Sequence, residues 1–258
     1  MVSIQNSIVL ITGASSGIGQ ACAKACAVAG TNLILAARRE DRLKKLAVDL
    51  QNEFGIETLV LPLDVCDRTQ VETRLGFLAE PWSNIDIVIN NAGLSRGLTK
   101  LHEGSIQDWE EMIDTNVKGL LYVTRALVPG MVERQQGHII NIGSIAGHET
   151  YPNGNVYCAT KAAVRAISAG LKQDLLGTPV RVSSVDPGLV ETEFSEVRFR
   201  GDTDRAKQVY KNLNPLTPED VADVVLFCAT RPIHVNVSEV LLLPTDQSGA
   251  TLVHRHFH

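Results

Sequence analysis

Short apolar runs rich in β-branched residues alternate with longer amphipathic segments along the chain. The apolar runs have the length and composition of buried strands and occupy residues 7–12, 32–37, 58–63, 85–89, 138–142, 180–185 and 239–244. Helical periodicity predicts helices between them, over residues 20–30, 40–54, 68–80, 106–134, 155–170 and 218–229. Because no linker interrupts this alternation, the sequence predicts a single α/β domain over residues 1–258.

A polar stretch breaks the alternation after the sixth predicted strand. Asp186-Pro187-Gly188 is followed by many charged residues, through Asp202. A proline and a glycine followed by a long polar connection are typical of a loop that moves over a binding site. The sequence therefore predicts a mobile lid at the carboxyl edge of the sheet.

A glycine-rich loop joins the first predicted strand to the first helix. It reads Gly13-Ala14-Ser15-Ser16-Gly17-Ile18-Gly19, a G-x-x-x-G-x-G spacing that differs from the common G-x-G-x-x-G dinucleotide fingerprint. The three glycines permit a tight turn and a close approach by a pyrophosphate, whose charge the N–H groups of the helix N-terminus would meet. We interpret the loop as a phosphate-binding site.

The same loop also matches the G-x-S-x-G nucleophile elbow of serine hydrolases, with Ser15 as the nucleophile. An elbow after the first strand has no preceding strand or loop to supply the second oxyanion donor. The third glycine, Gly19, has no role in that chemistry. A serine hydrolase is therefore the weaker interpretation.

Two arginines, Arg38 and Arg39, follow the second predicted strand. A dinucleotide-binding domain usually carries an acidic residue there, for the ribose 2′-hydroxyl. A guanidinium instead binds a 2′-phosphate bidentately, whereas a carboxylate repels it. The pair favours NADP over NAD. A solvated charge cluster at the start of the next helix is the alternative.

Polar residues follow three further strands. Asp64 stands where it could meet an adenine amino group, or it could cap the next helix. Asn90-Asn91-Ala92-Gly93 suits close packing against a cofactor, or it could be a turn. Ser144 follows the fifth strand, and ligands of parallel α/β sheets gather at such strand ends.

Tyr157 and Lys161 lie four residues apart in the predicted helix that opens at Asn155. This spacing puts both side chains on one face of the helix. A tyrosine with a pKa of about 10 is a poor acid or base at neutral pH, but a nearby positive charge favours the phenolate. We expect Lys161 to lower the pKa of Tyr157 and so to make it a general acid or base.

Asn116 stands inside the apolar helix predicted over residues 106–134. A buried asparagine is costly without hydrogen-bond partners. It is therefore expected either to bond to backbone groups or to hold a water molecule.

Composition excludes several classes of protein. Twenty-nine acidic against 24 basic residues give a net charge of −5, and no basic stripe interleaved with aromatic residues is present, so nucleic acid is not an expected partner. No apolar run approaches the roughly 18 residues of a membrane span, and no signal-type segment begins the chain. We expect a cytoplasmic protein that does not enter membranes.

Cysteine and histidine spacings do not favour a metal site. Five cysteines lack C-x-x-C spacing, and Cys22 and Cys26, one helical turn apart, are expected to pack in the core. Histidines alternate in the tail, at positions 254, 256 and 258, where metal binding is less expected than packing or fraying.

Taken together, the motifs resemble those of the short-chain dehydrogenase/reductase family: TGASSGIG at 12–19, NNAG at 90–93, Asn116, Ser144, Tyr157-x-x-x-Lys161 and Pro187-Gly188. The resemblance implies a Rossmann-like, doubly wound parallel sheet of about seven strands with helices on both faces. It also implies a homotetramer.

The resemblance further implies a catalytic tetrad, made of Asn116, Ser144, Tyr157 and Lys161. Lys161 would also bind the nicotinamide ribose, and Asn116 would hold a water in a proton relay. The implied cofactor site comprises Gly13, Ser15, Ser16, Gly17, Ile18, Gly19, Arg38, Arg39, Asp64, Val65, Asn91, Ala92, Gly93, Tyr157, Lys161, Pro187, Gly188, Val190 and Thr192.

A finer resemblance rests on ILAARRE, NVKGLLYVTRALVPGMVER, HIINIGSIAG and PGLVETEFSEVRFRGD. These segments are similar to the branch of NADP-dependent 3-hydroxy acid dehydrogenases that oxidise L-serine and L-allo-threonine and reduce malonic semialdehyde. A carboxylated substrate needs a cation in addition to Ser144 and Tyr157. We expect Arg198 or Arg200 in the lid to supply it, with Arg96 in reserve.

Two alternatives within the family stay open. A 3-oxoacyl thioester reductase or a broad carbonyl reductase would share the tetrad. A non-catalytic NADPH-sensing protein of this fold would be expected to have lost tetrad residues, which this chain has not.

Overall fold

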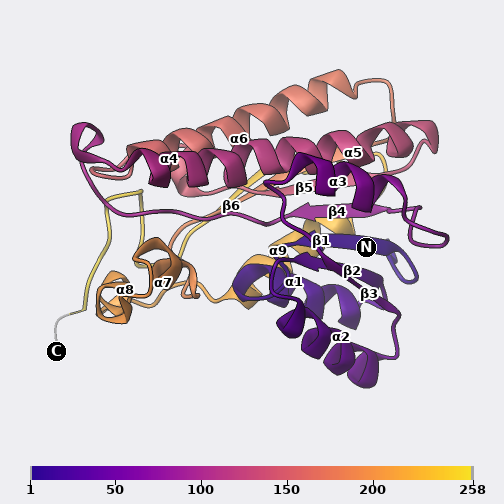
Figure 1. The fold of residues 1–258 in the computed structure, drawn as a ribbon, viewed down its shortest axis with the longest axis horizontal. Coiled ribbons are helices and arrows are strands. Elements are labelled where there is room, and N and C mark those ends of the chain that lie inside the picture. The colour runs from indigo at the N-terminus through magenta and orange to yellow at the C-terminus, as the bar shows by residue number, and fades with distance from the viewer. Residues whose placement is uncertain (1, 257–258) are drawn as a thin grey trace.

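Seven parallel strands form one sheet at the centre of the computed structural model, which describes residues 2–256. Their order is β3-β2-β1-β4-β5-β6-β7 (Figure 1). The strands are β1 (Ile8–Thr12), β2 (Asn32–Ala37), β3 (Thr58–Pro62), β4 (Ile87–Asn90), β5 (His138–Ile142), β6 (Arg181–Pro187) and β7 (Glu239–Leu242). Helical connections on both sides of this order confirm the doubly wound sheet that the resemblance implied.

Helices cover both faces of the sheet, because successive strand side chains point to opposite faces. Val9 and Ile11 of β1 pack on one side, whereas Ile8 and Leu10 pack on the other. The first side carries α1 (Gly17–Val28), α2 (Glu40–Phe54) and α9 (Pro218–Ala229). The second carries α3 (Arg68–Gly76), α5 (Leu120–Glu133) and α6 (Asn155–Asp174).

The helix predicted over residues 106–134 contains an irregular turn. It consists of α4 (Ile106–Ile113), a π-helical stretch (Asp114–Gly119) and α5. Asn116 lies in the π-helical stretch, a conformation that often marks functional positions. Apolar periodicity survives this one wide turn, which is why the sequence indicated an unbroken helix.

The predicted lid is more ordered than a loop. It contains α7 (Phe194–Arg198), and α8 (Thr203–Tyr210) begins directly after it; the two helices lie together at one end of the sheet in Figure 1. Asp202 caps α8 by accepting a hydrogen bond from the Arg205 N–H. The sequence did not indicate these two helices, because each carries too few residues to show a helical period. That the lid is mobile stays a prediction.

The chain also contains short 3-10 helices at Leu101–Glu103 and Ile145–Gly147. Cys22 and Cys26 lie on the buried face of α1 and pack in the core, as predicted. None of the helices among residues 2–256 combines the length and apolar composition needed to cross a membrane.

The C-terminal tail packs on the protein up to its last described residue. His256 Nε2 lies 3.1 Å from Asp246 Oδ2, and the rings of His254 and His256 meet edge to face. His258, the third histidine of the tail pattern, lies outside the described residues. Among those described, one group of three side chains could meet around a metal ion: His148, Asp186 and Glu239.

His138 is a buried titratable residue at the start of β5. Only 2 % of its surface is exposed, and Nε2 lies 2.8 Å from Ser183 Oγ. Burial, followed by the charge of Arg181, lowers the pKa of His138 from 6.5 to about 3. Folding therefore favours the neutral ring, and stability is lost as pH falls from 6.5 toward 3.

We expect the free energy of unfolding to fall by up to about 1.4 kcal/mol per pH unit in this window through His138 alone. Urea unfolding at several pH values measures the slope. His138→Gln should flatten it, whereas the exposed His234→Gln should leave it unchanged. Equal slopes in wild type and His138→Gln would show that His138 does not titrate on unfolding.

Candidate active site

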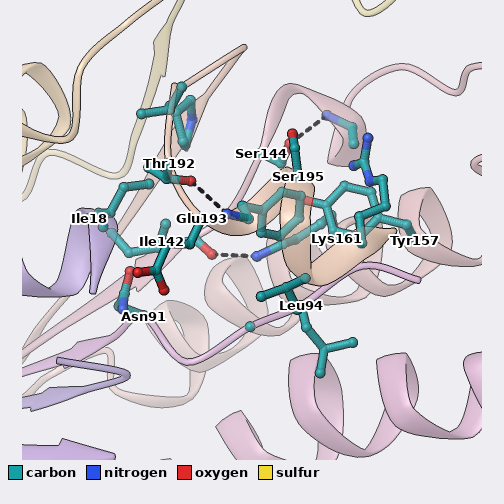
Figure 2. A pocket seen from close by; sticks show the side chains of 18 of the residues that line it. Ile18, Asn91, Leu94, Ile142, Ser144, Tyr157, Lys161, Thr192, Glu193 and Ser195 are labelled. Atoms are coloured by element: carbon teal, nitrogen blue, oxygen red, sulfur yellow. Dashed lines mark hydrogen bonds between the residues drawn. The ribbon is translucent and has the colours of Figure 1, made fainter. Parts of the chain in front are cut away.

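A cavity of about 790 Å³ opens where the glycine loop, the ends of the strands, α6 and the lid meet. Parallel α/β sheets bind ligands at this position, beside the point where strand order reverses between β1 and β4. Figure 2 shows side chains from these separate segments converging on it. The cavity is large enough for a dinucleotide and a small substrate together.

Nearly all of the residues predicted from the sequence line this one cavity. The lining includes Gly13, Ser15, Ser16, Gly17, Ile18, Arg38, Arg39, Asp64, Val65, Asn91, Ala92, Gly93, Ser144, Tyr157, Lys161, Pro187, Gly188, Val190, Thr192 and Arg198. Gly19 and Asn116 are not among its lining residues.

The glycine loop packs tightly against the β4 end. Gly13 has a φ of +67°, and a Cβ on it would lie 2.8 Å from Asn91 Nδ2. A Cβ on Gly19 would lie 2.4 Å from the Gly13 carbonyl oxygen, so any side chain there would push the loop apart. The loop therefore keeps its shape only with glycine at these positions.

Asn91 ties the β4 end to this loop. Its Nδ2 donates to the Thr12 carbonyl at 2.9 Å, while Thr12 Oγ1 accepts from the backbone N–H groups of Asn91 and Ala92 at 3.0 Å each. These bonds hold the floor of the cavity. The Asn90-Asn91-Ala92-Gly93 segment is thus more than a turn, and the cofactor-packing alternative is the one that the geometry favours.

Asp64 lines the cavity and does not cap α3. The cap is Asp67, whose carboxylate accepts from the Gln70 N–H, whereas Asp64 Oδ1 accepts from the Cys66 N–H at 3.0 Å. The N-cap alternative for Asp64 is therefore wrong. Its carboxylate stands at the end of β3, within the cavity wall.

Arg39 reaches back to the glycine loop. Its Nε donates to Ser15 Oγ at 3.1 Å, and its NH2 group donates to Ser16 Oγ at 2.6 Å. Arg38 is exposed and also lines the cavity. The solvated-cluster alternative does not describe Arg39, which is built into the phosphate-loop side of the cavity.

Tyr157 and Lys161 both enter the cavity from α6, as their spacing predicted, and are 8 % and 7 % exposed. Lys161 Nζ donates to the Ile142 carbonyl at 2.8 Å (Figure 2). Burial lowers the pKa of Lys161 to about 8, and the charge of Asp186 opposes this shift. An ammonium with two further N–H donors is thereby held at the cavity wall.

The pKa of Tyr157 departs from the expectation. Burial raises it above its ordinary value, against the opposing effects of the Arg198 charge and of a hydrogen bond with Ser144. The expected net lowering of the Tyr157 pKa is therefore wrong in this structure, because desolvation of the phenolate outweighs the groups that favour it.

Asn116 satisfies its side chain with protein groups. Its Oδ1 accepts from the Leu94 N–H at 2.8 Å, and its Nδ2 donates to the Leu94 carbonyl at 2.8 Å and to Thr160 Oγ1 at 3.0 Å. The backbone-bonded alternative holds, and both amide hydrogens are used. A Cβ on Gly93 would lie 3.3 Å from Asn116 Oδ1 and 3.6 Å from Lys161 Nζ, so both side chains lie against Gly93 in the cavity wall.

The three arginines considered for a substrate carboxylate have different environments. Arg200 pairs with Asp108 and Glu111, and Arg96 pairs with Glu111. Arg198 instead points at the cavity, with its guanidinium carbon 5.5 Å from the Tyr157 ring centre. The structure therefore removes Arg200 and Arg96 as candidates.

Arg198 has spare hydrogen-bonding capacity. Its NH2 group donates to the Tyr151 hydroxyl at 3.3 Å, and its guanidinium carbon lies 5.1 Å from the Phe194 ring centre. Arg198 Nε is buried and has no hydrogen-bond partner among the described residues. An unpartnered buried donor beside a cavity is costly, and an anionic ligand would relieve that cost.

Sequence reasoning missed several residues of the cavity wall. They stand in connections without a period, and the signals available were aromatic residues beside the α6 start and within the lid. The set comprises Tyr151, Phe194, Tyr210, Gln247 and Arg255.

Comparison with known proteins decides the family. The profile of the family described as short chain dehydrogenase matches residues 7–202. The chain belongs to the short chain dehydrogenase family. The enzyme class that the sequence predicted is thereby confirmed.

Relatives of this family cover nearly the whole chain. NADP-dependent 3-hydroxy acid dehydrogenase YdfG of Escherichia coli (strain K12) is 50% identical over 250 residues, 96% of this chain and 99% of that protein. NADP-dependent 3-hydroxy acid dehydrogenase of Schizosaccharomyces pombe is 44% identical over 256 residues, 99% of each chain. Among solved structures, the closed form of serine dehydrogenase complexed with NADP⁺ superposes with a TM-score of 0.90 at 49% identity, covering 96% of this chain and 100% of that one.

Proposed function

We propose that the protein is an NADP-dependent oxidoreductase that interconverts a small 3-hydroxy acid and its 3-oxo acid or semialdehyde. The observation that carries this proposal is Arg198, a cation with an unpartnered buried Nε beside Tyr157. It shares one cavity with the glycine loop and with Arg39. The names of the relatives support the same cofactor and substrate class.

The residues of the cavity fit NADP. The glycine loop leaves room that any Cβ would fill, and α1 starts there with N–H groups that suit a pyrophosphate. Arg39, braced by Ser15 and Ser16, and the exposed Arg38 would hold the 2′-phosphate. When bound, NADP supplies the acceptor for a hydride from the substrate carbon.

Tyr157 would exchange the proton of the reaction. In oxidation its phenolate takes the proton of the substrate 3-hydroxyl, and in reduction its hydroxyl returns a proton to the carbonyl oxygen. Ser144, which interacts with the Tyr157 hydroxyl, would hold the substrate oxygen in place. Lys161 would bind the nicotinamide ribose with its remaining N–H donors, and Asn116 would support the cavity wall at Gly93.

This role of Tyr157 makes the two directions respond oppositely to pH. Because its pKa is raised, the phenolate is scarce at neutral pH, so kcat for oxidation should rise with pH by up to about tenfold per unit. The hydroxyl form needed for reduction should persist into the alkaline range. Arg198→Ala removes a charge that lowers this pKa, and should move the alkaline rise to higher pH. Measuring kcat at several solvent viscosities shows whether product release limits the rate. If kcat is insensitive to viscosity and also independent of pH, the assignment of Tyr157 is contradicted.

An exposed apolar stripe supports the proposed homotetramer. Ile106 and Ile113 of α4 and Leu121 of α5, spaced by seven and eight residues, are 66 %, 40 % and 41 % exposed. Helical residues at this spacing share a face, and apolar faces of this kind mark interfaces. Sedimentation of the wild type and of Ile113→Glu tests the assembly.

We further propose a cytoplasmic location.

The substrate proposal is tested by following NADP reduction spectrophotometrically. The panel contains L-serine, L-allo-threonine, 3-hydroxybutyrate, 3-hydroxypropionate, a 3-hydroxyacyl thioester and a neutral secondary alcohol, each repeated with NAD. We expect the free acids with NADP to give the highest kcat/KM. Preference for the thioester would identify a 3-oxoacyl reductase instead.

A further inference from the structure

Glu193 forms an ion-pair bridge between the lid and the far side of the cavity. Its Oε2 accepts from Arg39 NH1 at 3.0 Å, and its Oε1 accepts from Arg42 NH1 at 2.8 Å. Glu193 directly precedes α7, whereas Arg39 and Arg42 belong to the start of α2. We refer to Glu193, Arg39 and Arg42 as the latch. The latch joins segments 154 residues apart in the sequence.

The latch uses the arginine that the proposed function assigns to a phosphate. Ser15 and Ser16 accept from Nε and NH2 of Arg39, and the Glu193 carboxylate takes NH1. Arg39 and Glu193 both line the cavity, and Figure 2 shows Glu193 beside Thr192 at its edge. A second anion that approaches this guanidinium meets a carboxylate already 3.0 Å away.

Glu193 is ionised at neutral pH. Partial burial opposes its charge, but hydrogen bonds from Arg42 and Arg39 outweigh burial and lower its pKa. A phosphate and a carboxylate on the same guanidinium repel each other. Arg42 offers Glu193 a partner that does not require Arg39, so the carboxylate can release Arg39 without losing its other bond.

We propose that Glu193 determines cofactor specificity by competing, from within the chain, with the 2′-phosphate of NADP for Arg39. This inference rests on the proposed function. NAD carries a 2′-hydroxyl in place of the phosphate and leaves the latch closed. Glu193 therefore weakens the binding of NADP selectively.

The size of the effect follows from the exposure of the pair. The side chains of Arg39 and Glu193 are 41 % and 42 % exposed, and exposed ion pairs are weak. Removing both the competition and the repulsion should tighten binding of a 2′-phosphate by about threefold to tenfold. The gain should shrink at high ionic strength, because salt screens charges that face solvent.

Calorimetric titration of the full-length, nucleotide-free enzyme tests this inference without catalysis. The probes are adenosine 2′,5′-bisphosphate and 5′-AMP, which differ only in the 2′-phosphate. The variants are Glu193→Gln, Arg39→Gln and, as a control with the same change of charge, Glu191→Gln. Glu191 is exposed and does not line the cavity. Circular dichroism and melting temperature establish that each variant is folded.

We expect Glu193→Gln to bind the bisphosphate about threefold to tenfold more tightly, with 5′-AMP and Glu191→Gln unchanged. If the wild type prefers the bisphosphate over 5′-AMP but Glu193→Gln binds the bisphosphate no more tightly than the wild type does, this inference is overturned. The proposed function would be unaffected by that result. If wild type and Arg39→Gln bind the two nucleotides equally, the 2′-phosphate site of the proposed function is wrong, and the competition falls with it.

Discussion

Tyr157→Phe should lower kcat by a factor of about 10² to 10⁴ while leaving the fold and NADP binding intact. The Tyr157 ring packs in a small apolar cluster, 5.7 Å from the Phe194 ring centre and beneath Arg198. Phenylalanine keeps this packing and loses only the hydroxyl. Steady-state kinetics together with the rise in melting temperature on adding NADPH measures both parts of the prediction.

A second tyrosine-to-phenylalanine substitution, outside the cavity, serves as the control for the loss of a tyrosine hydroxyl as such. Tyr122 lies on α5 and does not line the cavity, so Tyr122→Phe should keep wild-type kcat. A Tyr157→Phe enzyme with wild-type turnover would remove Tyr157 from the proton transfer. If it were inactive and also failed to bind NADPH, the loss would lie in the cofactor site.

Arg198→Ala should raise KM for 3-hydroxy acids by about tenfold to a hundredfold, as expected for loss of a charge-assisted hydrogen bond of about 1.5–3 kcal/mol. KM for a neutral secondary alcohol should hardly change, because it has no carboxylate. Since Arg198 also lowers the pKa of Tyr157, kcat for oxidation at neutral pH should fall with both substrates and recover at alkaline pH.

Arg200→Ala provides the control for Arg198. It removes a guanidinium from the same segment, but Arg200 bonds to Asp108 and Glu111 and does not line the cavity. Its KM for the acids should equal that of the wild type. An equal rise of KM for acids and for the neutral alcohol in Arg198→Ala would show that Arg198 shapes the cavity without binding a carboxylate.

The framework of the fold is predictable because local chemistry marks its boundaries. The helix expected over residues 40–54 is α2 to the residue, since Gly55 takes the left-handed conformation, with a φ of +68°, that ends helices. The helix over 218–229 is α9 to the residue, since Thr217 and Asp220 form a capping box around Pro218. Helical periodicity and capping residues therefore together define where these two helices begin and end.

The chemistry of the site is less predictable, because it depends on burial and on contacts between distant segments. Helical spacing put Tyr157 and Lys161 on one face, but desolvation, which decides the pKa of Tyr157, has no sequence signature. Likewise the sequence pointed to Arg198 and Arg200 together. Asp108 and Glu111 pair with Arg200 and leave Arg198 facing the cavity. Because these two acidic residues are distant from the arginines in the sequence, the pairing is visible only in the folded structure.

In the proposed reaction, a hydride passes from the carbinol carbon of a 3-hydroxy acid to NADP while Tyr157 carries the proton. The decisive experiment uses the best acid of the substrate panel, deuterated at C3, and mass spectrometry of the reduced cofactor. We predict one deuterium in each NADPH formed and a slower turnover than with the unlabelled acid. NADPH without deuterium, or label released into water, would contradict the account.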